Sequence, residues 1–290
     1  MTVITAMPEA IYHSCPELSA SIAKRLIEPG GPARWKWEHD HGRKDTKAFD
    51  LGHAAHKLVL GAGTPIARIP EERLARNGAT STKAAREWIA EAREQGVVPL
   101  KPAEYNQVHD MASALREHRA ASALLARAAD VELSAFAADE ATGVSLRCRF
   151  DAIGPSVLVD YKTSITANPA KWARSAVDYG YHMQAAHYEQ MAQLCQVTDE
   201  PMRFIVQEKA APYLVSVIRL DTAAIELGHQ RMREAIAIWQ QCHQTGIWPG
   251  YGEGEHLIEL PEWAYRTNDS SGLDPNVEAE LLALINQPES

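Results

Sequence analysis

RCRFDAIGPSVLVDYKTS, residues Arg147–Ser164, contains two segments with the two-residue alternation of β-strands, separated by a Gly154-Pro155-Ser156 turn. Because side chains alternate between the two faces of a strand, the charged residues of the first segment share one face: Arg147, Arg149 and Asp151. In the second segment the same rule places Asp160 and Lys162 on one face and Tyr161 on the other. We therefore expect a pair of strands that carries charges into a half-buried position.

The carboxylates and the lysine of this strand pair suit metal-dependent hydrolysis of phosphodiesters. Hard divalent cations bind carboxylate oxygens, and two cations ~3.5–4 Å apart can brace both oxygens of an in-line displacement. A lysine two residues after the second carboxylate would supply a compact positive charge for the attacking water or the phosphate. A structural ion pair at a sheet edge is the alternative, and it is the commoner explanation of an isolated Asp-x-Lys.

The composition is that of an ordinary globular protein. The chain has 290 residues, of which 46% are hydrophobic, and it contains neither a run of 18 apolar residues nor a basic and then apolar leader at its start. We expect a cytoplasmic protein without membrane contacts. The four cysteines, at positions 15, 148, 195 and 242, are widely separated, so neither a zinc ribbon nor an iron-sulfur cluster is predicted.

The net charge of −9 is unusual for a protein that binds nucleic acid, so its distribution along the chain matters. Residues 250–290 hold nine acidic residues and one basic residue, whereas residues 1–249 carry a net charge of only −1. A near-neutral body can present a local basic groove, and an acidic tail can keep DNA off other surfaces or bind a partner. The charge argues only against a protein that coats DNA over its whole surface.

A serine pair and a basic segment lie near the N-terminus. Ser19 and Ser21 precede a short amphipathic run with Lys24 and Arg25, as expected at a helix N-terminus, where backbone N–H groups also attract anions. Two tryptophans, at positions 35 and 37, lie among further basic residues, a pattern that can bind phosphates and bases. Helix capping and a solvated face with two core tryptophans explain the segment equally well.

Asp50–Leu60, DLGHAAHKLVL, is predicted to be a helix that is capped by its first residue and ended by Gly61. Gly52 lies about one turn before His56, so the surface beside the imidazole lacks a side chain and another group can approach it. His56 is therefore a candidate metal ligand. A helical histidine is more often a hydrogen-bonded structural residue, and His53 is a nearby rival.

The segments between and after these motifs supply a scaffold and two more candidate residues. Leu74–Gly96 and Pro102–Ala129 are predicted to be helices, the first with a cap supplied by Thr80–Thr82, and Val131–Ala137 is predicted to be a strand that pairs with the strand of Asp151. Glu132 on that strand either converges with Asp151 or is a surface glutamate at a sheet edge.

A helix is predicted over Tyr181–Cys195, with Gln184 and Tyr188 on one stripe. A buried amide needs hydrogen-bond partners, and substrate phosphate, a metal-bound water or backbone groups would each serve. Two further strands and a long helix complete the expected fold: Met202–Glu208, Tyr213–Leu220 and Asp221–Gly246.

The candidate residues occur in an order that resembles the PD-(D/E)XK nuclease superfamily: Gly52-x-x-x-His56, Glu132, Asp151, Asp160-Tyr161-Lys162 and Gln184-x-x-x-Tyr188. Within its RecB-like branch, the chain is most similar to the RecE (exonuclease VIII) type of phage and prophage exonucleases, which are related to phage lambda exonuclease. The similarity includes Ser19-x-Ser21, RCRFD and the block from Tyr181 to Tyr188. Phe150 and Tyr161 stand where the family often has proline and leucine, and neither departure removes a ligand.

The resemblance implies a fold and a set of site residues. The fold is α/β, a PD-(D/E)XK restriction-endonuclease-like core with a mixed central β-sheet flanked by helices. The implied metal ligands are His56, Asp151, Asp160 and the carbonyl of Tyr161. The implied catalytic residues are Lys162, Asp160, Asp151, Glu132, Gln184 and Tyr188, with Lys162 orienting the attacking water. The implied DNA contacts are Ser19, Ser21, Lys24, Arg25 and Arg149. Two Mg²⁺ ions per site are implied, and a histidine ligand suggests that Mn²⁺ can substitute.

The resemblance also implies an activity and partners. Such exonucleases digest linear double-stranded DNA processively from its 5′ ends, releasing 5′-mononucleotides and leaving 3′ single strands for a single-strand annealing protein in phage recombination. They form closed homo-oligomeric rings threaded by DNA, for which we favour a trimer, with a tetramer as the alternative. We expect a single nuclease domain over residues 1–290, encoded by a phage or prophage and acting in the bacterial cytoplasm. Its parts are a DNA-entry segment (1–50), a catalytic core (51–249) and an acidic extension (250–290).

Two other functions are alternatives to a RecE-type exonuclease. A Cas4-like or repair-associated nuclease would share the fold, but such proteins usually carry an iron-sulfur cysteine cluster, which the scattered cysteines argue against. A catalytically inactive nuclease fold, retained as a DNA-binding module, would lack a ligand or the lysine, and every expected position is filled.

Overall fold

The computed structural model describes residues 1–42, 48–61 and 65–269. The chain divides into two compact units, Met1–Tyr251 and Gly252–Ser290, and each is described by itself. The second unit contains the described helix α11 (Glu262–Asp269), and the acidic extension from residue 270 onward lies outside the described residues. Within the described parts of the chain, no helix is both long and apolar enough to cross a membrane.

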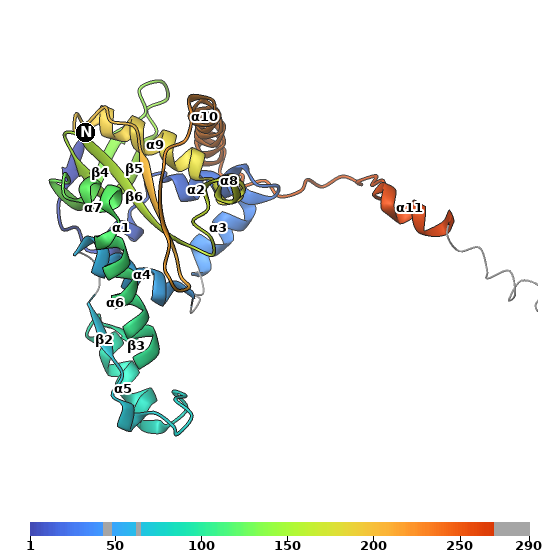
Figure 1. The fold of residues 1–290 in the computed structure, drawn as a ribbon. Coiled ribbons are helices and arrows are strands. Elements are labelled where there is room, and N and C mark those ends of the chain that lie inside the picture. Colours follow the sequence, from blue (N-terminus) through green and yellow to red (C-terminus); the bar gives the residue numbers. More distant parts are fainter. Residues whose placement is uncertain (43–47, 62–64, 270–290) are drawn as a thin grey trace, which may run out of the picture. The chain divides into compact units, whose positions relative to one another are not determined.

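The first unit is built on a mixed sheet of six strands, in the spatial order β1-β4-β5-β6-β7-β8 (Figure 1). The strands are β1 (Thr2–Ile4), β4 (Asp130–Ala138), β5 (Ser145–Gly154), β6 (Val157–Ser164), β7 (Arg203–Glu208) and β8 (Val215–Ile218). Neighbouring strands are antiparallel except β6 and β7, whose parallel pairing requires a crossover. Two helices supply it: α8 (Pro169–Asp178) and α9 (Tyr181–Leu194). The predicted α/β fold with a mixed central sheet is confirmed.

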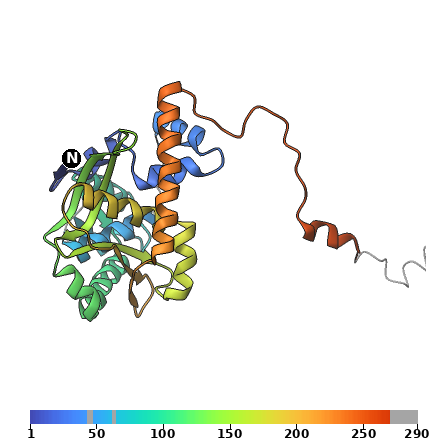
Figure 2. The same cartoon turned by 90° about the horizontal axis from the view of Figure 1, so that it is seen from above.

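Helices cover both faces of the sheet, each over its own hydrophobic cluster. The first face carries α9, α8, α2 (Ala20–Ile27) and the long α10 (Thr222–Thr245), which Figure 2 shows in orange beside the sheet. The second face carries α4 (Ala48–Leu60), α6 (Pro102–Glu117) and α7 (Arg119–Leu125). Alternation along β6 divides its residues between the two clusters, since Leu158 belongs to the first and Val159 and Tyr161 to the second.

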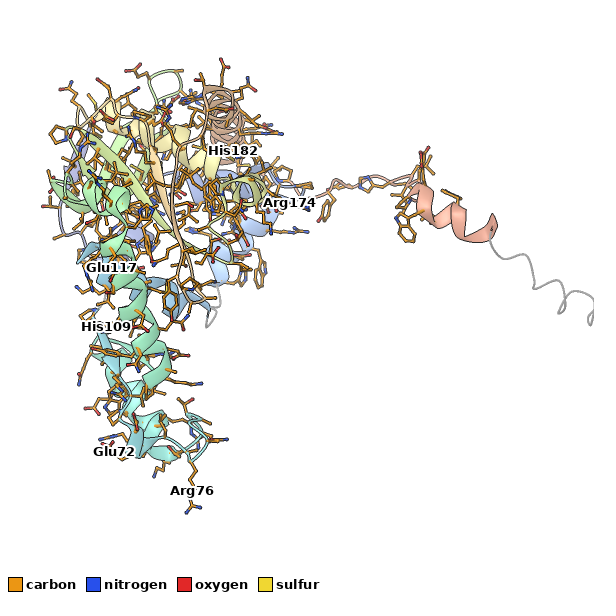
Figure 3. All side chains as sticks on the ribbon, in the orientation of Figure 1. Glu72, Arg76, His109, Glu117, Arg174 and His182 are labelled. Atoms are coloured by element: carbon orange, nitrogen blue, oxygen red, sulfur yellow. The ribbon has the colours of Figure 1, made fainter. Side chains whose placement is uncertain are left out.

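An extension projects from the body of the first unit, alongside the lower part of α6 (Figure 1). Its elements are β2 (Ile66–Arg68), a 3-10 helix (Glu71–Arg73), α5 (Lys83–Glu94) and β3 (Val98–Leu100), of which β2 and β3 form a parallel pair. Figure 3 labels Glu72 and Arg76 near its tip. Two further helices of the first unit are α1 (Glu9–Ser14) and α3 (Gly31–His41).

Two predicted helix boundaries near the second face are wrong. The helix expected to be capped at Asp50 already begins at Ala48. The helix expected over residues 102–129 breaks at His118, because the His118 Nδ1 accepts a hydrogen bond from the Ala121 N–H at 3.2 Å and caps a new helix, α7.

The helix predicted over Leu74–Gly96 is also shorter than expected. It begins only at Lys83, where the Thr82 hydroxyl caps α5. The preceding residues form turns, in which Gly78 has a left-handed conformation with a φ of +73°. The cap predicted among residues 80–82 is confirmed at Thr82, and it marks the true start of the helix.

Replacing either of two helical glycines by alanine adds one methyl group, but we expect the two replacements to change the free energy of unfolding in opposite directions. A Cβ on Gly228 of α10 would lie 2.2 Å from the carbonyl O of His182 on α9, whereas a Cβ on Gly52 of α4 would meet only the Thr163 Oγ1, at 3.9 Å. We expect Gly228→Ala to lower the free energy of unfolding by about 1–3 kcal/mol through overpacking. Gly52→Ala should raise it by roughly 0.5–1 kcal/mol through helix propensity.

Urea unfolding followed by circular dichroism measures both changes. Equal effects of the two substitutions would contradict the close approach of α9 and α10.

Candidate metal centre and active site

β5 and β6 separate where their carboxylates lie. These two fully described strands pair at three positions only: Ala152↔Val159, Ile153↔Leu158 and Gly154↔Val157. Beyond them, β6 continues against β7 and β5 continues against β4. The separation leaves backbone groups of β6 without a partner strand on that side. We call the gap between Asp151 on β5 and Tyr161 on β6 the fork.

Side chains replace strand pairing at the fork. The Tyr161 N–H donates to the Asp151 Oδ2 at 2.7 Å, and the Tyr161 carbonyl O lies 2.9 Å from the His56 Nε2. The same His56 Nε2 is 3.7 Å from the Asp151 Oδ2. Three of the four predicted metal ligands therefore meet here. The side chain of the rival His53 lies outside the described part of the structure.

Glu132 lies opposite Asp151 across the β4–β5 pair, because the register on either side is Val131↔Ala152 and Leu133↔Phe150. Its φ of 53° is left-handed, a conformation that costs a non-glycine residue about 1–3 kcal/mol. Side-chain alternation changes phase at this position: Phe150 packs in the first hydrophobic cluster and Ala152 in the second. Strict alternation did not predict this kink.

A cluster of metal-ligating side chains forms at the fork. Among the described residues, His56, Glu132 and Asp151 each offer a ligand atom within 4.8 Å of the others. The Glu132 Oε2 also lies 2.6 Å from the Arg149 Nε. A set of one imidazole nitrogen with carboxylate oxygens suits Mn²⁺ well and Mg²⁺ adequately.

Asp160 is almost completely buried beside this cluster, with 1% exposure. The Gln184 Nε2 donates to its Oδ1 at 2.5 Å, and the Lys162 Nζ lies 2.6 Å from its Oδ2. The Oδ2 is thus compensated by the Lys162 ammonium. The neighbouring imidazole and carboxylates of His56, Glu132 and Asp151 supply nitrogen and oxygen ligands that fit a divalent cation.

Burial and mutual charge shift the ionisation of the site. Burial, followed by the charge of Asp160, raises the pKa of Asp151 from 3.8 to about 7. Burial disfavours the charged form of Lys162, but the carboxylates of Asp160 and Asp151 outweigh it and raise the pKa of Lys162 above its ordinary value. In the metal-free protein Lys162 is therefore a positive charge at neutral pH.

A cavity of 1020 Å³ joins the fork to the N-terminal segment. It is lined by most of the predicted site residues: His56, Glu132, Arg149, Asp151, Lys162, Gln184 and Tyr188. Ser19, Ser21 and Lys24 line it as well, and the two serine hydroxyls are 3.0 Å apart. Arg25 does not line the cavity, and its guanidinium pairs with Glu38 at 2.8 Å.

Tyr12 and Arg147 also line the cavity, and neither was predicted as a site residue. Arg147 is 4% exposed, and its Nε and Nη1 form no hydrogen bond with any described residue. Its guanidinium lies 4.7 Å from the centre of the Tyr12 ring, and that of Arg149 lies 5.5 Å away. Arg147 alternates along β5 with Arg149 and Asp151 and so shares their strand face, which could have identified it as a site residue from the sequence. No sequence pattern near Tyr12 predicts its place in the site, because its contacts are with residues far away in the chain.

The raised pKa of Asp151 predicts a pH-dependent stability in metal-free protein. Between pH ~4 and ~7 folded Asp151 binds its proton more tightly than the unfolded chain does, so the free energy of unfolding should fall as pH rises through this window. Relative to Asp151→Asn, the native protein should lose roughly a few kcal/mol across it. Urea unfolding in EDTA at a series of pH values measures the difference. A difference that stays constant with pH would contradict the burial of an ionisable carboxyl at the fork.

Two solved structures give a first comparison. A crystal structure of a "Putative exonuclease" from Eubacterium rectale has a TM-score of 0.56 at 13% sequence identity, covering 93% of this chain and 100% of that one. A second, the crystal structure of SSO0001, covers 77% of this chain and 96% of that one at 13% identity, with a TM-score of only 0.25. No match was found among curated proteins.

The family comparison covers most of the chain. The model of the PDDEXK-like domain of unknown function (DUF3799) matches residues 19–260, which include strands β4–β8, the fork and most of the residues that line the cavity. The PD-(D/E)XK superfamily expected from the order of the site residues is thus confirmed, together with the α/β fold. The chain belongs to this PDDEXK-like family, whose fold is that of divalent-metal-dependent nucleases.

Proposed function

We propose that this protein is a RecE-type exonuclease that digests linear double-stranded DNA from its 5′ ends, releases 5′-mononucleotides and leaves 3′ single strands. The observation that carries the proposal is the single cavity that holds both the metal-ligating cluster with Lys162 and the hydroxyls and lysine of the N-terminal segment. A hydrolytic centre and a terminal-phosphate site within one cavity suit an enzyme that works at DNA ends.

The residues at the fork have separable roles in this proposal. His56, Glu132 and Asp151, with Asp160 and the Tyr161 carbonyl, would hold one or two Mg²⁺ or Mn²⁺ ions. Such an ion supplies Lewis-acid stabilisation of the charge on the phosphate. Protonated Lys162 holds the attacking water and offsets negative charge. Gln184 fixes the Asp160 carboxylate through its 2.5 Å hydrogen bond, and Tyr188 packs edge-on against Phe150 at the cavity wall.

The N-terminal wall would bind the 5′-terminal phosphate. Ser19 and Ser21 stand at the N-terminus of α2, where backbone N–H groups favour an anion, and Lys24 lies one turn further along. Arg147 adds a buried guanidinium with two nitrogens that form no hydrogen bond with a described residue, and Arg149 adds a second cation. Arg25 lies outside the cavity, so the contact we propose for it is with the DNA backbone beyond the end.

Assembly and biological setting are part of the same proposal. A closed ring of identical subunits, a trimer in preference to a tetramer, would retain DNA and make digestion processive. A single-strand annealing protein would take up the 3′ strands in phage recombination in the bacterial cytoplasm. These statements, and the polarity, are supported by the resemblance of the site residues to RecE-type enzymes.

Digestion of linear DNA with distinguishable 5′ and 3′ labels tests the activity and its polarity together. We expect release of the 5′ label as mononucleotide with Mg²⁺, none with EDTA and none from closed circular DNA. Lys162→Ala should slow release by about 10²- to 10³-fold, because it removes a charge that stabilises the transition state. Lys171→Ala, at an exposed position of α8, is the matched control and should leave the rate unchanged.

Three results would contradict the proposal. Equal cutting of circular DNA would indicate an endonuclease, and earlier release of the 3′ label would reverse the polarity. DNA binding without cleavage would indicate an inactive nuclease fold.

The N-terminal wall predicts a preference for phosphorylated ends. Native protein should digest DNA with a 5′-phosphate faster than DNA with a 5′-hydroxyl, and Ser21→Ala and Lys24→Gln should each reduce that preference about tenfold, the loss expected for one hydrogen bond to a charged group. Arg25→Gln is the comparison variant and should keep the preference. Equal initial rates of the native protein on both kinds of end would rule out a terminal-phosphate site here.

A further inference from the structure

A buried hydrogen-bond network lies on the second face of the sheet, directly behind the fork. The Tyr161 hydroxyl donates to the Gln207 Oε1 at 2.7 Å. The Gln207 Nε2 in turn donates to the Met111 carbonyl O at 2.8 Å and to the Tyr213 carbonyl O at 3.3 Å. Tyr161 and Gln207 both have 0% exposure. The network therefore ties β6, β7, α6 and the turn before β8 together through two fully buried side chains.

The orientation of the Gln207 amide is fixed by these partners. Its NH₂ group faces two carbonyl oxygens and its oxygen faces a hydroxyl donor, so a flipped amide would place oxygen against oxygen. A buried polar side chain that satisfies all of its hydrogen bonds is rigid, and removing one member leaves the others unsatisfied. Gln207 thus holds the Tyr161 ring in one position.

The Tyr161 side chain leads from this network to the candidate ligands. Its ring packs edge-on against the His56 imidazole, with centroids 5.1 Å apart at 65°. Its main-chain N–H and carbonyl O contact Asp151 and His56 at 2.7 and 2.9 Å. One residue therefore touches two candidate ligands through its main chain and one of them again through its ring. A displacement of the ring would move both.

We propose that Gln207 is a positioning residue for the metal centre, acting through the Tyr161 hydroxyl to set the His56 imidazole and the Asp151 carboxylate. This inference rests on the metal centre of the proposed function. It adds a residue from β7, on the side of the sheet away from the cavity, that touches neither DNA nor the cation. Supporting groups behind metal ligands typically change metal affinity by 10- to 100-fold when they are removed.

Mn²⁺ binding in the absence of DNA, measured by isothermal titration calorimetry on the full chain, tests the inference without an activity assay. Tyr161→Phe keeps the ring and removes only the hydroxyl, and Gln207→Leu removes the amide. Each should weaken Mn²⁺ binding about tenfold. The double variant should be no weaker than either single one, because both act through the same hydrogen bond.

Ser216→Ala is the matched control. Ser216 on β8 also donates a hydrogen bond to a backbone carbonyl, that of Ala167 at 2.6 Å, but it has no contact with the fork. It should lower the urea midpoint without changing Mn²⁺ affinity, which separates positioning from general stability. If Gln207→Leu does not fold, Tyr161→Phe alone carries the test.

Three outcomes would overturn the inference in distinguishable ways. In the first outcome, the native protein binds Mn²⁺ and Tyr161→Phe binds it within twofold of the native affinity. Gln207 would then have no positioning role, and the metal centre would remain supported. Single effects that multiply in the double variant would show that Gln207 does not act through the Tyr161 hydroxyl. Native protein that binds no Mn²⁺ would overturn the metal centre together with this inference.

Discussion

The separation of β5 from β6 is the constraint on which the site depends. Paired strands satisfy each other's backbone groups, and where they part those groups must find other partners. At the fork, the Tyr161 N–H is satisfied by the Asp151 carboxylate and its carbonyl faces the His56 imidazole. The gap also lets groups from both faces of the sheet meet, since His56 comes from α4 on the second face and Gln184 from α9 on the first. An intact sheet would keep the two faces apart.

Burial of like charges at this gap gives the site its chemistry. Asp151 and Asp160 are close enough to raise the pKa of Asp151, and Lys162 and Arg149 offset only part of the local negative charge. Such an arrangement is costly in an empty protein and becomes favourable when a divalent cation binds. The left-handed backbone of Glu132 adds strain at the same place, as is common where function dictates geometry.

Much of this site could be predicted from the sequence because its residues lie in short motifs with strong local patterns. Alternation in RCRFDAIGPSVLVDYKTS placed Asp160 and Lys162 opposite Tyr161, and the spacing of Gln184 and Tyr188 placed both on one helix. Strict alternation missed the change of phase at Glu132 and Asp151, where Glu132 has a left-handed backbone conformation. The roles of Tyr12 and Gln207 were equally out of reach, since each depends on residues that only the folded chain brings together.

The central claim is that the fork holds a divalent cation between His56, Glu132 and Asp151. A crystal structure of the protein soaked with Mn²⁺ and recorded near the manganese absorption edge tests it most directly. An anomalous-difference peak is expected within coordination distance, about 2.0–2.3 Å, of oxygen or nitrogen atoms of these three residues. The absence of a peak at the fork, or a peak held by other residues while the fork stays empty, would contradict it.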